Sequence, residues 1–207
     1  MSELIFYTNP QSRGRIVHWM LEELGEPYQT EWIEYGEQMK SAEYRKINPM
    51  GKVPAIRHNG AIVTECAAIC TYLALQFPDK QLIPAREDPR QADFTRWMFF
   101  TAAPLEMVTT GRSMGWEVPE DRQRMVGFGN YNDVFNALEL ALLKGPHVCG
   151  EQFTAVDVYL GSALMWGMQF GTIDKRPIFE EYVARLTRRP AAQNATRIND
   201  ERANAQE

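Results

Sequence analysis

The sequence predicts an α/β domain followed by an all-α domain (α/β + all-α). Three observations support this prediction. Short strand-like runs alternate with helical periodicity up to about residue 80, prolines and charged residues cluster next, and strand signals are absent after that cluster. The 207 residues are 44% hydrophobic and 24% charged, which is the usual composition of a folded globular chain.

The first domain, residues 1–80, is predicted to follow the element order βαβαββα. Strands are recognised by short apolar runs, helices by apolar residues three and four apart, and their boundaries by glycine and proline. A hairpin near the end of the domain implies a mixed sheet. The expected elements are strands 4–7, 28–33, 53–56 and 61–63 and helices 16–24, 37–47 and 67–77.

Residues 81–87 are predicted to link the two domains, because prolines and charged residues alternate around them. The second domain, residues 88–207, is predicted to be a helical bundle, and Thr154 and Asp157 in it have the spacing of a capping box. Residues beyond Pro190 are polar, so we expect a frayed or weakly docked tail there. Helices are expected around residues 94–105, 131–142, 154–170 and 178–186.

Charge and cysteine content argue against several functions. The net charge is −5 and no basic run occurs, so we expect no binding to nucleic acid or to an anionic membrane. No apolar stretch approaches the ~20 residues of a membrane span, and the N-terminus lacks the features of a signal peptide. The three cysteines show no CxxC spacing, so we expect no metal site and no disulfide framework, and a cytoplasmic location fits best.

The first candidate site is the polar turn at residues 8–12, which follows a strand and precedes an arginine-rich helix start. Side chains such as Asn9 and Ser12, next to unpaired helix N–H groups, favour an anion, and a thiolate fits. Lowering a thiol pKa from ~8.5 to ~6.5 requires about 2.7 kcal/mol, which one hydrogen bond and a helix dipole can supply. The simpler alternative is that Ser12 or Asn9 only caps the helix.

The second candidate site is the segment NPMGKVP at residues 48–54. Pro54 opens a predicted buried strand, which is unusual unless its peptide bond is cis or its nitrogen has no ladder partner. A cis bond turns the backbone of Val53 outward, where an extended peptide can pair with it, and Lys52 is then placed to hold a carboxylate. The alternative is an edge-strand proline beside a solvated lysine.

The third candidate site is the junction at residues 63–66, where a strand gives way directly to a helix. Free N–H groups at the helix start can hold a carboxylate, and Glu65 can hold an amine. Together they would bind the two charges of an amino-acid head group. The alternative is that Thr64 caps the helix while Glu65 interacts favourably with its dipole.

Taken in order along the chain, these segments resemble the cytosolic glutathione transferases. The resemblance rests on the polar turn, on residues 48–54, on the Thr64-Glu65 pair and on TAVD at residues 154–157, and it covers nearly the whole chain. It implies a thioredoxin-like first domain that binds glutathione and a helical second domain that contributes a pocket for an apolar electrophile. The implied activity is conjugation of glutathione by a cytoplasmic homodimer that uses glutathione as co-substrate and needs no metal.

The resemblance also implies roles for single residues. Val53, in the loop with Pro54, would pair with the cysteinyl backbone of glutathione, and Lys52 would contact the glycyl carboxylate. Glu65 and Cys66 would hold the γ-glutamyl end. The family commonly has serine where this chain has Cys66, and because an S–H group is a poor donor, carboxylate binding would depend more on backbone N–H groups.

Branches of the family activate the thiol with tyrosine, serine or cysteine, and the turn after the first strand contains no cysteine. The lack of cysteine argues against a mixed-disulfide mechanism. By the resemblance, Ser12 lies at the helix start where serine-using branches place their residue, and Tyr7 lies at the strand end where tyrosine-using branches place theirs. We rank Ser12 first as activating residue, Tyr7 second and Asn9 third. Two alternative functions are glutathione-dependent reduction of peroxides or disulfides and a non-catalytic, partner-binding relative. Side chains that either line the electrophile pocket or, more simply, pack in the core are Trp97, Phe100, Met107, Trp116 and Trp166.

Overall fold

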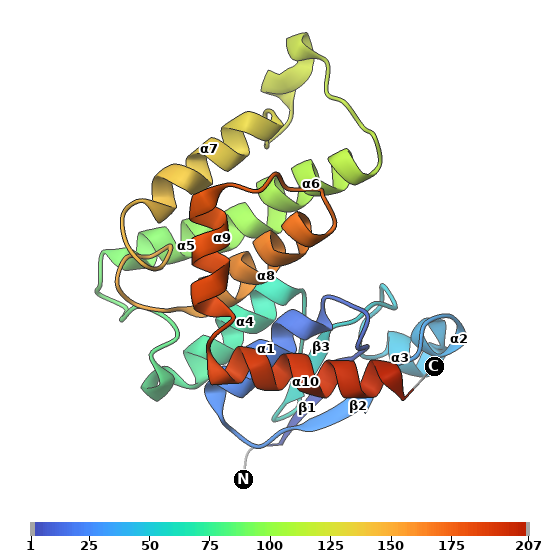
Figure 1. Ribbon diagram of the computed structural model, residues 1–207. Coiled ribbons are helices and arrows are strands. Elements are labelled where there is room, and N and C mark those ends of the chain that lie inside the picture. Colours follow the sequence, from blue (N-terminus) through green and yellow to red (C-terminus); the bar gives the residue numbers. More distant parts are fainter. Residues whose placement is uncertain (1–2, 206–207) are drawn as a thin grey trace. The chain divides into compact units, whose positions relative to one another are not determined.

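The computed structural model describes residues 3–205 and contains two compact units (Figure 1). The first unit consists of the residues up to Lys80 together with those from Arg188 onward, and the second runs from Gln81 to Thr187. The sequence predicts one helical domain over residues 88–207, whereas in the structure the chain from Arg188 on belongs to the first unit.

The first unit is built on a four-stranded mixed sheet with the order β2-β1-β3-β4. Strand β1 is parallel to β2 and antiparallel to β3, and β3 is antiparallel to β4. The mixed sheet and the hairpin that the sequence predicts are therefore confirmed. The strands are β1 (Leu4–Thr8), β2 (Gln29–Trp32), β3 (Ala55–His58) and β4 (Ala61–Thr64).

Helices complete the predicted βαβαββα order of the first unit. The weak helix expected over residues 37–47 is divided at Ser41, whose backbone is extended and whose hydroxyl accepts a hydrogen bond from the N–H of Tyr44. Ser41 thus ends one short helix and caps the next. The helices are α1 (Gly14–Leu24), α2 (Glu37–Lys40), α3 (Ala42–Arg45), α4 (Cys66–Gln76), the 3₁₀ turn η1 (Pro78–Lys80) and α10 (Pro190–Asn204).

Successive side chains of β1 point to opposite faces of the sheet. Phe6 faces α1, where its ring meets the ring of His18 edge-on at 5.3 Å between centroids. Ile5 and Tyr7 face the other way and pack in a cluster with Tyr44 of α3. Because side chains cover both faces, β1 is buried along its whole length.

The polar C-terminal segment forms helix α10, so the expectation of a frayed or weakly docked tail is wrong. Asn199 of α10 lies 3.0 Å from Nδ1 of His18 in α1, and both side chains are buried. The guanidinium of Arg189 forms an ion pair with Glu23 of α1 at 2.6 Å. Polar composition is misleading here because the buried face of α10 is narrow and made of small or amide side chains: Ala192, Ala195 and Asn199.

We expect the stability of the first unit to fall in mild acid because of His18. Burial lowers the pKa of His18, so the unfolded chain, in which this pKa is ~6.5, binds more protons than the folded one as the pH falls below that value. The free energy of unfolding, measured in urea, should decrease between about pH 6.5 and pH 5. His18→Phe should make this part of the profile flatter, whereas equal slopes in both proteins would exclude His18 as the cause.

The second unit is helical throughout its regular elements, as the sequence predicts. Helix α5 continues into α6 through η2, a π-helical turn that contains Pro104. The core of the unit includes Phe135 and Phe179, which are fully buried with ring centroids 6.0 Å apart. The elements are α5 (Arg90–Phe100), η2 (Thr101–Leu105), α6 (Glu106–Ser113), the 3₁₀ segment η3 (Glu120–Met125), α7 (Tyr131–Leu142), α8 (Ala155–Gln169) and α9 (Pro177–Leu186).

The predicted capping box at the start of α8 is confirmed and extends into a buried network. The carboxylate of Asp157 accepts a hydrogen bond from the N–H of Thr154 at 2.8 Å. Its other oxygen accepts from the N–H of Val148 at 3.0 Å and from the hydroxyl of Tyr182 at 2.7 Å. The carboxylate thus joins the preceding loop, α8 and α9.

Asp157→Ala should strongly destabilise the protein. The substitution leaves buried donors of Thr154, Val148 and Tyr182 without their acceptor, and each such donor costs about 1–3 kcal/mol. We expect the free energy of unfolding in urea to fall by about 3 kcal/mol or more. Asp133→Ala, at an exposed position in the first turn of α7, is the matched control and should cost about 1 kcal/mol or less. A similar loss in both variants would contradict a special role for Asp157.

Candidate functional site

Three chain segments meet at one edge of the sheet because of its register. Tyr7 near the end of β1 pairs with Ala55 at the start of β3, and Ala55 pairs with Thr64 at the end of β4. The turn after β1, the loop before β3 and the start of α4 therefore lie at the same edge. These are the three segments in which the sequence predicts chemistry.

Asn9 anchors the turn after β1. Its side chain is 3% exposed, its amide Nδ2 donates to the C=O of Ile33 at 2.9 Å, and its Oδ1 accepts from the N–H of Gln11 at 2.9 Å. The N–H of Ile33 in turn donates to the C=O of Thr8 at 2.7 Å. Asn9 therefore holds the end of β1 to the segment after β2, and both polar groups of its side chain are engaged with backbone.

Ser12 lies in the same turn, directly before α1. Its hydroxyl donates to the C=O of Asn9 at 2.7 Å and accepts from the N–H of Gly14 at 2.9 Å. The N-cap residue of α1 is Arg13, so these contacts of Ser12 order the turn directly before the helix rather than cap the helix itself. The side chain is half-buried, so its oxygen lies near the start of α1, where helix N–H groups favour negative charge.

Tyr7 is 8% exposed and lies in the cluster on the other face of the sheet, with its ring centroid 6.1 Å from that of Tyr44. Burial raises the pKa of Tyr7, and the nearby guanidinium of Arg57 offsets part of this effect. The phenol therefore stays protonated at neutral pH and can act as a hydrogen-bond donor.

The loop before β3 presents free backbone beside this turn. The peptide bond between Val53 and Pro54 is cis. Strand β3, which follows, is an inner strand of the sheet, paired with β1 on one side and with β4 on the other. Among the described residues, no backbone hydrogen bond uses the N–H or C=O of Val53. The C=O of Lys52 accepts from the hydroxyl of Tyr44 at 2.8 Å and from Nδ2 of Asn48 at 2.8 Å, while the Lys52 side chain is exposed.

Lys40 of α2 supports this loop, a role that the sequence does not predict. Its ammonium donates to the C=O of Gly51 at 2.6 Å and to the C=O of Met50 at 3.1 Å. Gly51 has φ +57°, and a Cβ there would stand 2.7 Å from the C=O of Met39. The glycine of the NPMGKVP segment thus allows α2 and the loop to approach closely, whereas no sequence pattern links Lys40 to a loop ten residues away.

The start of α4 is the third segment. Glu65 has φ +69°, a left-handed conformation that is costly for a residue with a side chain, and its own side chain forms no cap bond. Cys66 is buried, and its Sγ lies 3.7 Å from the C=O of Arg13. This contact brings the N-terminus of α4 against the turn that begins α1, so two helix starts lie together at the sheet edge.

Comparison with known proteins shows relatives across most of the chain. A family model described as glutathione S-transferase, N-terminal domain, matches residues 12–76. Glutathione S-transferase GstA of Escherichia coli O157:H7 is 27% identical over 155 residues, 74% of this chain and 76% of that protein. Glutathione S-transferase hmp2 of Hypomyces subiculosus is 29% identical over 205 residues, 92% of this chain and 96% of that protein.

Solved structures agree with these sequence relatives. The crystal structure of a glutathione transferase from Methylococcus capsulatus matches with a TM-score of 0.79 at 27% identity, covering 95% of this chain and 98% of that one. The family model, the sequence relatives and this structure together support a cytosolic glutathione transferase family for this chain. A glutathione transferase homologue from Sulfitobacter, solved with bound glutathione, matches with a TM-score of 0.73 at 25% identity and covers 97% and 99% of the two chains.

The family model and the matched structure show a thioredoxin-like first unit and a helical second unit. The relatives carry different reaction names: maleylacetoacetate isomerase of Mus musculus is 29% identical over 135 residues, 62% of this chain and 59% of that protein. The family model covers most of the segments at the sheet edge. Six of the predicted site residues lie within it: Ser12, Lys52, Val53, Pro54, Glu65 and Cys66.

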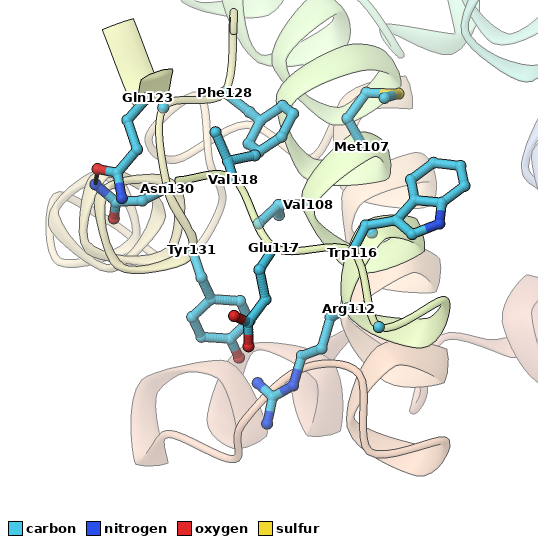
Figure 2. Close-up of a pocket in the computed structure, with 13 residues that line it drawn as sticks. Met107, Val108, Arg112, Trp116, Glu117, Val118, Gln123, Phe128, Asn130 and Tyr131 are labelled. Atoms are coloured by element: carbon cyan, nitrogen blue, oxygen red, sulfur yellow. Dashed lines mark hydrogen bonds between the residues drawn. The ribbon is translucent and has the colours of Figure 1, made fainter. Parts of the chain in front are cut away.

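Among residues 3–205, no three His, Cys, Asp or Glu side chains lie in a position to hold a metal ion. The described helices include none with the length and hydropathy needed to cross a membrane. Burial raises the pKa of Cys70 well above its usual value, so its thiol is unreactive. Trp97 is buried in the core of the helical unit, whereas Met107 and Trp116 line a cavity there (Figure 2).

Gly14→Ala should disrupt the start of α1. A Cβ on Gly14 would stand 1.9 Å from Oγ1 of Thr8 and 2.9 Å from Oγ of Ser12. We expect the free energy of unfolding to fall by about 1–3 kcal/mol, as in other overpacked cores. Thr8→Ala in the same chain should recover part of this loss, because it removes the nearer atom.

Gly111→Ala is the matched control for Gly14→Ala. Gly111 lies within α6, and the nearest atom to its Cβ position is 3.8 Å away. This substitution should leave stability unchanged or raise it by up to ~1 kcal/mol. Equal effects of the two substitutions would show that α1 can move away from β1 at no cost.

Proposed function

We propose that this protein is a glutathione S-transferase that binds glutathione at the sheet edge and activates its thiol for conjugation to an apolar electrophile. One observation carries the proposal: the starts of α1 and α4 and the unpaired backbone of Val53 lie at the same edge of one sheet. Helix starts bind carboxylates and thiolates, and free extended backbone binds a peptide.

Each part of glutathione has a partner in this arrangement. The backbone of Val53 pairs with the cysteinyl residue, and the exposed ammonium of Lys52 meets the glycyl carboxylate. The carboxylate of Glu65 accepts hydrogen bonds from the charged γ-glutamyl amine. Because the Sγ of Cys66 already faces the C=O of Arg13, the γ-glutamyl carboxylate is held by backbone N–H groups of α4 rather than by the thiol.

We propose Ser12 as the residue that stabilises the thiolate. Its hydroxyl, which donates to the C=O of Asn9, can rotate to donate to a ligand instead. The C=O of Asn9 then still accepts a hydrogen bond from the N–H of Ser12, at 3.2 Å. A hydrogen bond to a charged sulfur of about 1.5–3 kcal/mol plus a helix dipole of about 0.3–1 kcal/mol lowers the thiol pKa by about two units. Tyr7, a neutral phenol, is the second candidate, and Asn9 is the third because its amide is engaged.

The reaction follows from a thiolate held in place. The sulfur attacks an electrophilic carbon of the acceptor, a carbon–sulfur bond forms, and a leaving group departs or a double bond takes up a proton. The enzyme supplies ionisation and proximity. By the family resemblance we further propose that the helical domain contributes the electrophile pocket, and that the protein is a cytoplasmic homodimer.

A second candidate is isomerisation or reduction with the same thiolate. The relationship to maleylacetoacetate isomerase favours the isomerase, in which the sulfur would add to a double bond and then leave. Glutathione-dependent reduction of a peroxide or disulfide uses the same thiolate with a different acceptor. In a non-catalytic relative, glutathione would bind and no acceptor would react.

Ser12→Ala should raise the apparent pKa of turnover. We expect the pH profile of kcat/KM, measured with glutathione and 1-chloro-2,4-dinitrobenzene, to shift upward by about one to two units, with a loss of about 10- to 100-fold below the new pKa. At high pH the rates of variant and wild type should converge, because the thiol then ionises without help.

Ser113→Ala is the matched control, since Ser113 also donates its hydroxyl to a backbone carbonyl at a helix end. Its profile should equal that of the wild type. An unchanged profile for Ser12→Ala with a shifted one for Tyr7→Phe would transfer the role to Tyr7. Parallel assays with cumene hydroperoxide and with maleylacetone distinguish reduction and isomerisation from conjugation. Heat of glutathione binding without turnover of any acceptor would indicate the non-catalytic relative.

A further inference from the structure

The hydroxyl of Thr8 is buried beside the proposed thiolate site and lacks a hydrogen-bond partner. Thr8 ends β1, its side chain is fully buried, and within residues 3–205 its Oγ1 neither donates nor accepts a hydrogen bond. The other buried threonine and serine side chains of that range, Thr101, Thr154 and Ser162, each donate to an acceptor. Burial of an unpaired hydroxyl is unfavourable, so the exception at Thr8 requires an explanation.

The side chain of Thr8 points to the start of α1. Phe6, two residues earlier on β1, faces α1, and side chains two residues apart lie on the same face of a strand. A Cβ on Gly14 would stand 1.9 Å from Oγ1 of Thr8 and 2.9 Å from Oγ of Ser12. The two hydroxyl oxygens therefore border the same small gap, which glycine at position 14 keeps open.

The oxygen of Ser12 has room for one more donor. A hydroxyl oxygen can accept two hydrogen bonds, and among the described residues Oγ of Ser12 accepts one, from the N–H of Gly14 at 2.9 Å. Its own proton is donated to the C=O of Asn9 at 2.7 Å. When that proton turns to the sulfur of glutathione, negative charge is drawn onto Oγ of Ser12, and a second donor to this oxygen stabilises it.

We propose that Thr8 is a positioning residue for Ser12: with glutathione bound, the hydroxyl of Thr8 donates to Oγ of Ser12 while Ser12 donates to the sulfur. This proposal rests on the proposed function and deepens it, because it names the group that supports the activating serine. The gap over Gly14 gives Oγ of Ser12 room to turn toward Thr8. In a chain of hydrogen bonds each member polarises the next, which strengthens each bond by about 10–30%.

The test replaces Thr8 by valine, which keeps the shape of the side chain, and by serine, which keeps the hydroxyl. The measurement is the ultraviolet absorbance of the thiolate of bound glutathione against pH, with the full-length protein and no acceptor. Thr8→Val should raise the pKa of the bound thiol by about half a unit, a ~3-fold change in its ionisation constant. Thr8→Ser should keep the wild-type pKa. A side chain that acts only by packing would give the opposite order, because valine fills the space of threonine better than serine does.

A double-mutant cycle shows whether Thr8 acts through Ser12. In the Ser12→Ala protein, Thr8→Val should have no further effect on the thiol pKa, because the oxygen that accepts from Thr8 is then absent. Thr101→Val is the matched control. The hydroxyl of Thr101 is also buried, but it donates to the C=O of Trp97 at 2.8 Å within the helical unit, so this substitution should leave the thiol pKa unchanged.

Thermal unfolding without glutathione gives a second readout, which is independent of the proposed function. Thr8→Val removes a buried hydroxyl that has no partner among the described residues, so it should raise the midpoint of unfolding by about 2–4 °C. Thr101→Val loses a hydrogen bond and should not raise the midpoint. A lower midpoint for Thr8→Val would show that the hydroxyl is already paired in the free protein and would overturn the proposal.

Three results of the thiol titration would also overturn it: an unchanged pKa in Thr8→Val, equal shifts in Thr8→Val and Thr8→Ser, or a shift by Thr8→Val that is the same with and without the hydroxyl of Ser12. If Ser12→Ala still raises the thiol pKa in such a case, the proposed function stands and only the role of Thr8 fails. If the wild type shows no ionised glutathione at neutral pH, both fail.

Discussion

The pairing register of β1, β3 and β4 is the constraint on which the proposed glutathione site depends. It aligns Tyr7, Ala55 and Thr64 across three strands and so brings the segments that follow or precede them to one edge. A slip of one residue would exchange the two faces of a strand. Phe6, which contacts His18, would then face the cluster around Tyr44. Burial on both faces of β1 therefore protects the geometry of the site as well as the fold.

Much of the site consists of backbone that side chains hold in place. Asn9 fixes the end of β1, Lys40 holds the loop carbonyls at residues 50 and 51, and Tyr44 holds the C=O of Lys52. Backbone donors and acceptors presented in this way can bind a peptide whatever its side chains are. An ordering contact and the proposed functional role are therefore compatible at Ser12, because the hydroxyl that orders the turn would also lie beside the thiol in the proposed site.

Local signals in the sequence predict most of the fold and only part of the site. The element order, the cis bond before Pro54 as one of two alternatives, and the Thr154–Asp157 capping box all involve residues close together in the chain. The supporting contacts do not. Cys66 meets the C=O of Arg13 across 53 positions, and Asn199 meets His18 across 181. No periodicity encodes such pairs, and the polar composition of α10 conceals its narrow buried face.

The two parts of the first unit lie at opposite ends of the chain, and this has a consequence for biosynthesis. Helix α10 packs along α1, and Arg189 pairs with Glu23. A ribosome that makes the protein from its N-terminus exposes α1 well before α10. The sheet unit therefore acquires the helix that covers α1 only after the whole of the helical unit has been synthesised.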